Sequence, residues 1–599
     1  YLKNFNSRTM SDYIKGGEFL IKKGSPEDIF IPYEMDEEQK MIYSTCEQFL
    51  DSEVFPNLDA IDKLQEGLMP SLLDKAGELG MLGISIPEEY AGFGKDFITG
   101  MLATEACGPG HSFSVAFAAH TGIGTLPILY YGNKEQKQKY IPKLASGEWK
   151  ASYCLTEPNA GSDANSGKTK AVLTDDGKHY IINGQKMWIT NGGFADVFTV
   201  FAKIGDDKNL SAFIVDANTE GVSLNPEEKK MGIKGSSTVQ VFFNDVKVPV
   251  ENMLSEQGNG FKIALNILNI GRIKLAGATL GAAKKCITHA IEYANERSQF
   301  GTKIANFGAI QSKIAKMATK VYALESATYR CSKSIQRAIE SLEASGLSKE
   351  ESLLKGVEQF AAEAAILKVH GSETLDFCVD EAVQIYGGMG YSAESPVERM
   401  YRDSRINRIF EGTNEINRLL TVDMLIRKTM KGELDLMTPA MKVAEELMEI
   451  PDFGDDDTSV LDEFEKTNEQ FKKAVLLVAG AGIKAKGMEL KDEQEIVMNI
   501  ADLAIESYIS DSLVLRLRKI ESMGKLEEYH TQLGESYLFE AADRMFSAGK
   551  EAIWSMGESD ELRMAQIGVK RFTKVRQSNI HQTRQAIAKM LLNENKYNI

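Results

Sequence analysis

The chain has 599 residues, of which 43% are hydrophobic and 26% are charged, and its formal net charge is −17 at pH 7. This length is too great for one hydrophobic core, and at about 150 residues per domain it predicts a soluble enzyme of three or four domains. The negative charge argues against a nucleic-acid-binding protein, because such proteins need a positive surface to displace counterions from phosphates. An anionic ligand must therefore be held by local groups.

The cysteines and the apolar runs indicate a reducing, aqueous compartment. Six cysteines, at positions 46, 107, 154, 286, 331 and 378, form no C-x-x-C pair, and the seven histidines include no H-E-x-x-H motif. We therefore expect reduced thiols and no metal site. The sequence has neither about 18 to 20 uninterrupted apolar residues nor a signal-peptide pattern, so we expect a cytoplasmic protein without a membrane-spanning helix.

Residues 36–150 carry helical periodicity, after a leader of residues 1–35. Apolar side chains recur at Met41, Cys46 and Phe49, which is the spacing of one helix face. From 151 to 262 the pattern changes to short β-rich runs. Within them, Asn183 and Gly184 separate two apolar runs, which predicts a hairpin turn between two strands.

Helical periodicity returns over residues 263–440, for example at Ile310, Ile314 and Met317. Residues 441–458 contain the acidic, turn-rich run Pro451–Asp457 and are predicted to be a linker. Residues 459–599 are predicted to form an additional helical domain. The fold class is therefore α+β, mostly α, in the order helices, sheet, helices and additional helices.

Two stretches of the last helical domain suggest surfaces. An apolar stripe that suits packing against another helix consists of Ile496, Val497, Ile500, Leu503 and Ala504. The stretch from Lys570 to Met590 mixes basic and apolar side chains. It is interpreted as a solvated charged face or, alternatively, as a weak peripheral contact with an anionic membrane.

Four segments carry candidate chemistry, although none matches the nucleotide motifs G-x-G-x-x-G or G-x-x-x-x-G-K-[ST]. The first, Tyr153–Asp163, is a hydroxyl-rich loop whose N–H and hydroxyl groups suit a flat heterocycle and its phosphates. The second, Lys186–Gly193, puts Trp188 and Thr190 on one face of a strand, which suits an isoalloxazine ring. A plain loop and a buried core aromatic are the alternatives.

The third segment, Arg297–Gly301, lies at the end of a predicted helix. The planar guanidinium of Arg297 suits phosphate, or else it caps the helix in solvent. The fourth segment begins with the glycine-rich run Gln384–Tyr391, where backbone can approach a ligand closely.

Glu411 belongs to the later part of the fourth segment. It follows the apolar residues Ile409 and Phe410 and precedes a new helix that Thr413 or Asn414 is expected to cap. Apolar surroundings disfavour a charged carboxylate and raise its proton affinity toward that of a general base. Glu411 is therefore a candidate base, although it is one of 86 acidic residues.

Together the four segments resemble the acyl-CoA dehydrogenase family over about residues 36–430. The runs that carry the resemblance are Tyr153–Pro158, Trp188–Thr190, Arg297–Gly301, Gln384–Gly390 and Glu411–Asn414. The resemblance implies an N-terminal helical domain, a middle β-barrel-like domain and a C-terminal four-helix bundle. Two further runs, Met231–Ser236 and Ile267–Arg272, and the helical extension resemble the very-long-chain branch, so a long-chain acyl-CoA is the expected substrate.

The resemblance also implies FAD as the cofactor and a homodimer, in which a second subunit contributes part of each FAD site. The implied FAD-binding residues are Tyr153, Leu155, Thr156, Gly161, Ser162, Trp188, Ile189, Thr190, Arg297, Gln299, Phe300, Phe307, Gln384, Ile385, Gly387, Gly388, Thr413, Asn414 and Glu415. Related enzymes without the extension pair two dimers into a tetramer. In the very-long-chain branch the extension fills the space where the second dimer would pack, so a dimer is expected here.

The implied reaction removes the α-proton of an acyl thioester with Glu411 while a hydride passes from the β-carbon to the flavin. The product is a trans-2-enoyl-CoA of fatty acid β-oxidation, and the backbone N–H of the base helps to hold the thioester oxygen. Substrate-binding residues are implied at Ser162, Asn269, Arg272 and Gly412, although Arg272 alone could cap a helix. Some relatives carry the base at the position of Gly271, which leaves Glu411 without a rival here.

The resemblance implies an electron-transferring flavoprotein as the partner that accepts the electrons. Two alternatives remain. In an acyl-CoA oxidase, oxygen accepts the electrons on the same scaffold. In an assembly or scaffold protein, the helical extension is the main interface.

Overall fold

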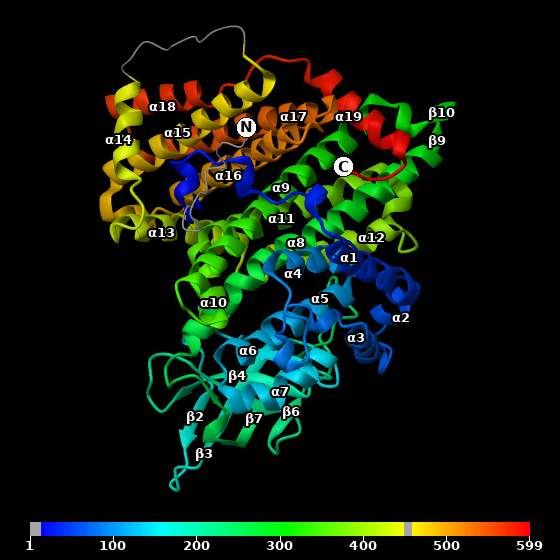
Figure 1. Cartoon of the computed structure of the whole chain (residues 1–599), viewed down its shortest axis with the longest axis vertical. Coiled ribbons are helices and arrows are strands. Elements are labelled where there is room, and N and C mark those ends of the chain that lie inside the picture. Colours follow the sequence, from blue (N-terminus) through cyan, green and yellow to red (C-terminus); the bar gives the residue numbers. More distant parts are fainter. Residues whose placement is uncertain (1–12, 448–457) are drawn as a thin grey trace, which may run out of the picture.

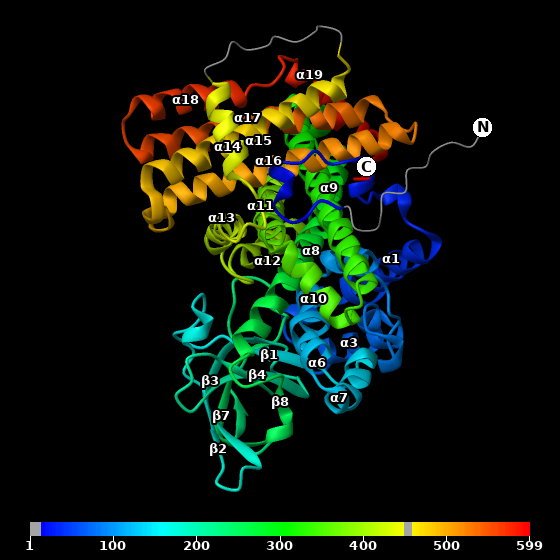
Figure 2. The same cartoon turned by 60° about the vertical axis from the view of Figure 1, so that its left-hand side comes forward.

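The computed structural model describes residues 13–447 and 458–599. Its elements follow the order predicted from the sequence (Figure 1): the β domain lies at one end of the long axis, long helices fill the middle, and the C-terminal extension lies at the other end. The turned view in Figure 2 shows the same separation. The β domain and the extension therefore contact the long helices from opposite ends.

The N-terminal helices lie beside the upper edge of the β domain. They are α1 (Glu37–Phe49), α2 (Leu58–Asp62), α3 (Leu68–Glu78), α4 (Phe97–Cys107), α5 (Ser112–Ala119), α6 (Leu126–Tyr131) and α7 (Lys134–Ser146). Asp36 starts α1, because its carboxylate accepts a hydrogen bond from the Gln39 N–H at 2.8 Å. Helices α4 and α5 are buried along most of their length, which makes them walls of the core.

The β domain forms one eight-stranded sheet in the order β6-β7-β3-β2-β4-β5-β8, with β1 paired to β4. Its strands are β1 (Ala151–Cys154), β2 (Lys170–Leu173), β3 (His179–Thr190), β4 (Val197–Ile204), β5 (Ser211–Asp216), β6 (Val222–Leu224), β7 (Thr238–Pro249) and β8 (Met253–Leu254). Most neighbours are antiparallel, whereas β1 and β2 run parallel to β4. The side chains of β4 and β5 are almost all buried.

The hairpin predicted at Asn183–Gly184 is wrong, because β3 runs through both residues as one strand. The Asn183 side chain instead pairs across an irregularity in the ladder: its Nδ2 donates to Asp245 Oδ1 at 2.9 Å, and its Oδ1 accepts from the Asp245 N–H at 2.8 Å. A β-carbon on Gly184 would lie 2.4 Å from Thr169 Oγ1. The glycine is therefore required by close packing and not by a turn.

The long helices form the middle of the molecule. They are α8 (Gly260–Glu296), α9 (Gly308–Ala344), α10 (Lys349–Gln359), α11 (Ala361–Tyr386), α12 (Pro396–Ser404) and α13 (Asn414–Met430). A short hairpin of β9 (Ser298–Gln299) and β10 (Thr302–Lys303) follows α8. Helices α8 and α11 lie side by side, and both bury most of their residues.

The extension packs its own helices onto α9 and α13. They are α14 (Met437–Glu446), α15 (Val460–Lys486), α16 (Gln494–Ser522), α17 (Glu528–Met556), α18 (Asp560–Phe572) and α19 (Ile580–Glu594). The predicted apolar stripe on α16 is buried, which confirms its packing role. Helix α14 occupies the beginning of the predicted linker 441–458, and the run Pro451–Asp457 lies outside the described residues.

Three features bear on other sequence predictions. All six cysteines are free and buried, as expected. Two segments, Ser112–Tyr131 and Gly260–Glu296, are long and apolar enough to cross a membrane. However, 72% and 67% of their apolar 18-residue stretches are buried inside the fold, as in core helices. Phe572 and Ile587 are fully buried, so they take no part in the membrane contact considered for Lys570–Met590, which stays a prediction.

Candidate active site

The loop that carries Glu411 has an unusual backbone conformation. Glu411 and Gly412 have φ values of 58° and 81°, and Thr413 then caps α13 by accepting a hydrogen bond from the Ile416 N–H at 3.3 Å. A non-glycine residue with positive φ is strained unless its surroundings hold it. The predicted cap is therefore confirmed at Thr413, and the loop needs external support.

Three side chains supply that support through the loop carbonyls. Arg272 Nε donates to the Glu411 carbonyl oxygen at 3.3 Å, and Lys368 Nζ donates to the Gly412 carbonyl oxygen at 2.6 Å. Asn417 Nδ2 lies 3.3 Å and 2.8 Å from the same two oxygens. The strained peptide is thus held from α8, α11 and α13 together.

The carboxylate of Glu411 has the protonation behaviour of a base near neutrality. Burial raises its pKa to about 7, and the charges of Arg272 and Lys368 oppose this rise. Its Oε2 is buried and has no hydrogen-bond partner among the described residues. The pKa of Lys368 is itself lowered to about 8 by burial. A carboxylate with these properties is suited to accept a proton from a ligand.

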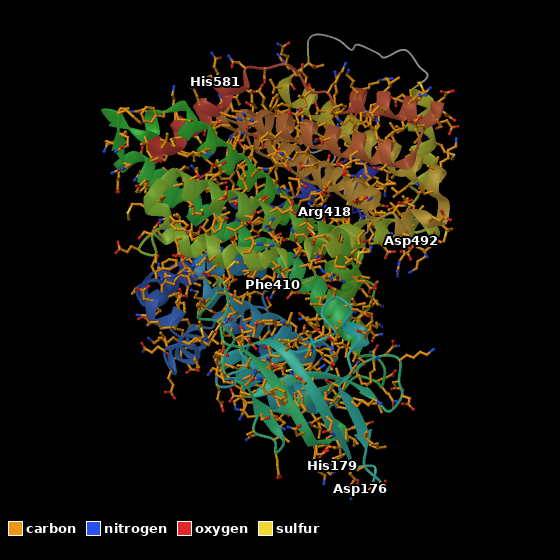
Figure 3. The ribbon with its side chains drawn as sticks, turned by 180° about the vertical axis from the view of Figure 1, so that it is seen from behind. Asp176, His179, Phe410, Arg418, Asp492 and His581 are labelled. Atoms are coloured by element: carbon orange, nitrogen blue, oxygen red, sulfur yellow. The ribbon has the colours of Figure 1, made fainter. Side chains whose placement is uncertain are left out.

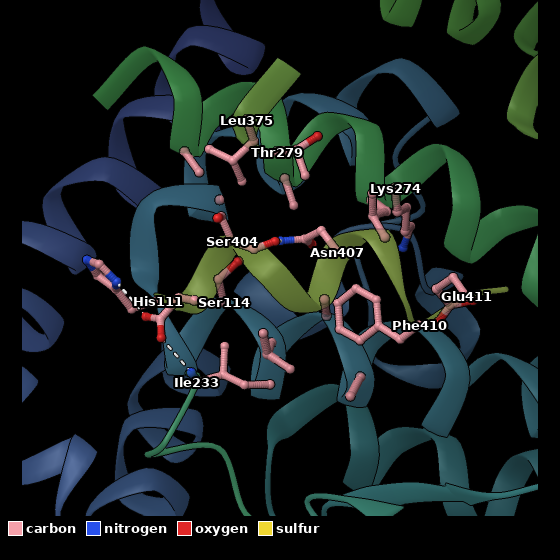
Figure 4. A pocket seen from close by; sticks show the side chains of 18 of the residues that line it. His111, Ser114, Ile233, Lys274, Thr279, Leu375, Ser404, Asn407, Phe410 and Glu411 are labelled. Carbon is pink, nitrogen blue, oxygen red and sulfur yellow. Dashed lines mark hydrogen bonds and ion pairs between the residues drawn. The ribbon is translucent and has the colours of Figure 1, made fainter. Parts of the chain in front are cut away.

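A deep pocket leads away from Glu411. It contains about 1050 Å³ of space, part of it open to solvent. Along α8 it is lined by residues on one helix face, namely Gly271, Lys274, Leu275, Ala278, Thr279 and Ala282. Figure 4 shows Phe410 and Glu411 at one end of the pocket and His111 at the other. The pocket is therefore elongated along α8.

Asp403 closes the far end of the pocket. Its Oδ2 lies 2.9 Å from His111 Nδ1, and its Oδ1 accepts a hydrogen bond from the Ile233 N–H at 2.5 Å. His111 and Ile233 both have positive φ values, 53° and 44°. One carboxylate on α12 therefore holds two strained residues, one from the N-terminal helices and one from the β domain.

Lys274 brings an unpaired cation to the pocket wall. Over the described residues 13–447 and 458–599, no hydrogen bond or ion pair involves its ammonium group, and burial lowers its pKa to about 8. Lys274 also borders a second cavity, whose other walls include Gly100 and Thr104 of α4 and Tyr130. The lysine therefore lies between two cavities.

The first two predicted cofactor segments come together beside this pocket. Lys186 Nζ donates to the Leu155 carbonyl oxygen at 3.1 Å, and the Met187 N–H donates to the Thr156 carbonyl oxygen at 2.9 Å. The ladder is irregular between Lys186 and Ile189, where Trp188 has φ 61° and is 52% exposed. This irregularity presents the indole outward and corrects the expectation of a regular strand there.

Tyr153 and Thr190 connect these segments to Glu411. Thr190 lines the pocket, and Ile189 beside it is buried. The Tyr153 hydroxyl is buried without a partner in the described part of the chain, and its pKa is raised by burial and by the charge of Glu411. The Tyr153 hydroxyl therefore lies close enough to Glu411 to be affected by its charge. Gly161 and Ser162 lie on the exposed loop that follows.

Other predicted cofactor residues lie far from Glu411 within the chain. Arg297, Gln299, Phe300 and Phe307 follow the end of α8, and Gln384, Ile385, Gly387 and Gly388 lie at the end of α11. At a rise of about 1.5 Å per residue, Arg297 is roughly 39 Å along α8 from Gly271, and Gln384 is roughly 24 Å along α11 from Lys368. One chain therefore does not bring all the predicted residues to one place.

The predicted substrate-binding residues also lie in different places, some beside Glu411 and one on an exposed loop. Asn269 and Arg272 are buried, and Arg272 Nη1 donates to Asn269 Oδ1 at 2.7 Å. Gly412 lies in the Glu411 loop, with Asn414 and Glu415 directly after it at the start of α13. Ser162 is exposed on its loop. Arg272 thus supports the candidate base and does not cap α8, since it lies inside that helix.

Sequence reasoning missed Lys368, Asn417 and Lys274. Lys368 lies in the apolar run Ala364–Val369, where a single charged residue inside a buried helix is a detectable signal. Lys274 is likewise flanked by Ile273 and Leu275. Asn417 is one of several polar residues near a helix start, and its contacts with three successive carbonyl oxygens follow only from the loop conformation.

Four family models match the chain. They are the acyl-CoA dehydrogenase N-terminal domain over residues 36–148, the middle domain over 152–246, and two C-terminal domain models over 258–425 and 470–571. The matched segments follow the helices, the sheet, the long helices and the extension in that order.

Three similar proteins extend this result. A probable acyl-CoA dehydrogenase of Bacillus subtilis is 44% identical over 99% of this chain and its own full length. The very long-chain specific acyl-CoA dehydrogenase of Rattus norvegicus is 44% identical over 60% of this chain and 53% of its own length. The crystal structure of an acyl-CoA dehydrogenase complexed with FAD from Bacillus anthracis has a TM-score of 0.94 and 43% identity, covering 98% of this chain and all of that one.

Proposed function

Because the chain belongs to the acyl-CoA dehydrogenase family, we propose that it oxidises long-chain fatty acyl-CoA to trans-2-enoyl-CoA with FAD as its cofactor. The observation that carries the proposal is Glu411: a buried carboxylate with a pKa of about 7 at one end of a long pocket. Such a group is partly deprotonated near neutral pH and can then accept a proton from a ligand held against it.

The residues on the β-domain side of the pocket fit an FAD. The buried Tyr153 hydroxyl lacks a partner in the described residues, the Trp188 indole is half exposed, and a β-carbon on Gly161 would meet nothing within 4 Å. When bound, FAD supplies the hydride acceptor of the reaction. Tyr153, Leu155, Thr156, Trp188, Ile189 and Thr190 would line one side of it, with Thr413, Asn414 and Glu415 near the base.

Glu411 is proposed to remove the proton from the α-carbon of the thioester. In the described part of the chain its backbone N–H makes no hydrogen bond, so it is available to the thioester oxygen as negative charge develops there. Arg272 and Lys368 hold the carbonyl oxygens of Glu411 and Gly412, which fixes the loop that carries this N–H and the carboxylate. Ser162, Asn269, Arg272 and Gly412 are the proposed contacts for the rest of the substrate.

The length of the pocket supports a long acyl chain. From Gly271 to Ala282 it follows α8 over eleven residue-to-residue steps, which is about 16 Å at 1.5 Å per step. Small side chains, including Ala278 and Ala282, leave the helix face open. An extended chain of roughly a dozen carbons at covalent bond lengths of about 1.5 Å fits this length. Two thioester-proximal carbons would then remain beside Glu411.

A homodimer accounts for the predicted cofactor residues that lie far from Glu411. The hairpin after α8 exposes 95% of Phe300, and Gly387 and Gly388 have open space where a side chain would be. Two such glycines and an exposed aromatic suit contact with the nucleotide part of an FAD held by a second subunit. The proposed dimer therefore completes each cofactor site with residues of both copies.

The place of the reaction is proposed from the family alone. We infer fatty acid β-oxidation in the cytoplasm, with an electron-transferring flavoprotein as the electron acceptor. An oxidase would use the same base and the same cofactor contacts. Anaerobic reduction of the flavin by acyl-CoA, followed by reoxidation with oxygen or with an electron-transferring flavoprotein, distinguishes the two.

The experiment that tests the proposal is anaerobic flavin reduction in Glu411→Gln. This variant keeps the shape of the side chain but removes the proton acceptor. We expect it to purify with FAD and to reduce its flavin about 10²- to 10⁴-fold more slowly than the unchanged enzyme. Asp423→Asn, on an exposed part of α13, is the matched control. Reduction of Glu411→Gln at the rate of this control would refute the assignment.

A further inference from the structure

The helical extension makes a direct ionic contact with the helix that follows the candidate base. Asp502 on α16 accepts a hydrogen bond at its Oδ1 from Arg418 Nε on α13, at 2.7 Å. Figure 3 shows Arg418 on the extension side of Phe410, which adjoins the base. The Arg418 side chain is 16% exposed and that of Asp502 is 39% exposed, so the ion pair is only partly buried. Burial raises the pKa of Asp502, and the charge of Arg418 opposes this rise. Partly buried pairs are screened by salt less than fully exposed ones.

Arg418 uses its remaining nitrogen atoms to hold a carboxylate on α11. Its Nη1 and Nη2 lie 2.8 Å and 3.0 Å from the two carboxylate oxygens of Glu373. This two-point geometry fixes the orientation of both groups. Glu373 Oε1 also accepts a hydrogen bond from Asn414 Nδ2 at 3.0 Å. The orientation of Asn414 is thereby linked to Arg418.

Asn414 also contacts Lys368, the cation that supports the loop of Glu411. Its Oδ1 lies 2.8 Å from Lys368 Nζ, and the same ammonium group donates to the Gly412 carbonyl oxygen. Glu411 directly precedes Gly412 in the strained loop. A continuous series of hydrogen bonds and ion pairs therefore connects Asp502 to the peptide of Glu411. It runs through Arg418, Glu373, Asn414 and Lys368.

We propose that Asp502 of the extension is a positioning residue for Glu411. The extension thereby contributes to catalysis as well as to packing, because it holds Arg418, and through it Asn414 and Lys368, in the one arrangement that supports the loop. This inference rests on the proposed role of Glu411 as the base. It predicts that removing one charge on α16 changes proton transfer without emptying the flavin site.

The test compares Asp502→Asn with Glu34→Gln. Glu34 also forms an ion pair with α16, through Lys519 at 2.7 Å, and its side chain is 30% exposed against 39% for Asp502. The Glu34 pair therefore joins the extension to the rest of the chain without any contact to the Glu411 loop. Both variants are measured as FAD-containing full-length protein, by thermal unfolding and by anaerobic flavin reduction with a long-chain acyl-CoA.

Asp502→Asn is expected to reduce the flavin about three- to tenfold more slowly than Glu34→Gln at equal thermal midpoint, because a loosened loop misplaces the carboxylate. Its apparent kinetic pKa should also move upward. The cation that lowers the pKa of Glu411 on this side is Lys368, which faces Glu411, Arg272, Glu373 and Glu415, and loosening it weakens that effect. Asp502→Glu should restore most of the rate.

A double-mutant cycle tests whether the effect of Asp502 on Glu411 passes through Lys368. In a Lys368→Met background the series is already broken, so Asp502→Asn should cost no further rate. An undiminished cost in that background, or equal rates and pH profiles for Asp502→Asn and Glu34→Gln, would refute the positioning role. If Lys368→Met does not fold, the comparison of the two single variants still decides.

The role of Glu411 as the base and the positioning role of Asp502 are refuted by different results. If Glu411→Gln reduces its flavin normally, the base assignment is wrong whatever Asp502 does. If Glu411→Gln is inactive while Asp502→Asn behaves like Glu34→Gln, the base assignment stands and the role of the extension does not.

Discussion

Gly271 lies directly against the carboxylate of Glu411: a β-carbon built on Gly271 would be 2.7 Å from Glu411 Oε2 and 3.0 Å from its Cδ. The sequence shows Gly271 only as a position without a competing acid. The structure shows that the missing side chain makes room for the carboxylate of Glu411. The two residues therefore form one unit across α8 and the loop before α13.

Gly271→Ala should separate stability from activity. Alanine has a higher helix propensity than glycine by about 0.8–1.0 kcal/mol, and the atom it meets is the end of a flexible side chain. We expect the thermal midpoint to stay the same or rise, while displacement of the carboxylate lowers the rate of flavin reduction by roughly 10- to 100-fold. Stopped-flow reduction and thermal unfolding measure the two effects.

The matched control for that variant is Gly277→Ala on the same helix. Its β-carbon would meet the flexible end of Met101 at 3.0 Å, and Gly277 does not line the pocket. An equal loss of rate in both variants would show that α8 responds to any added side chain and that Gly271 has no specific relation to Glu411.

The rate of flavin reduction should rise with pH through about 7. The base works only when deprotonated, and burial raises the pKa of Glu411 to about 7. Because the charge of Lys368 lowers this pKa, Lys368→Met should move the rise to higher pH. Single-turnover rates between pH 5.5 and about 9 measure the midpoint. A midpoint that moves downward in Lys368→Met would contradict the electrostatic assignment.

Lys274→Met should stabilise the protein. Burial lowers the pKa of Lys274 to about 8, so the folded state disfavours its charged form. This cost is complete below pH 8 and disappears as the pH rises toward 10.5, where the unfolded chain also loses the proton. We expect a gain of about 1–3 kcal/mol in unfolding free energy at pH 7, smaller at pH 10. A gain that does not depend on pH would contradict this explanation.

Phe300→Ser should weaken the proposed dimer. Phe300 is 95% exposed and lies 6.2 Å, between ring centroids, from Phe307. Losing a contact of this size typically weakens association about tenfold or more. Sedimentation or light scattering over a dilution series measures it, together with retention of FAD. Trp554→Ser, at a 67% exposed site on α17, is the control, and equal behaviour of the two variants would remove Phe300 from the interface.

The family, the fold class and the order of the helical and β regions could be predicted because periodicity and short motifs are local properties. The cap at Thr413 is an example, since it depends only on the residue type before an apolar helix face. The Asn183–Gly184 prediction failed for the complementary reason. Its dipeptide is typical of a turn, but Thr169 and Asp245, both distant in sequence, decide its conformation.

The support of the candidate site could not be predicted for the same physical reason. Lys368 and Asn417 act on Glu411 and Gly412 through carbonyl oxygens, which every residue has, so no sequence pattern marks the contact. The separation of Arg297 and Gln384 from Glu411 was expected only through the family resemblance, which implies a second subunit at each FAD site. Their distance from Glu411 follows from the lengths of α8 and α11 and becomes clear only when the helices are assembled.

Asp403 has a further consequence for how the pocket forms. Its carboxylate holds His111 and Ile233, so three parts of the sequence, more than a hundred residues apart from one another, meet at the pocket floor. No single one of these three regions can form the pocket floor by itself. It exists only when all three regions have docked, so the depth of the pocket depends on complete assembly of the chain.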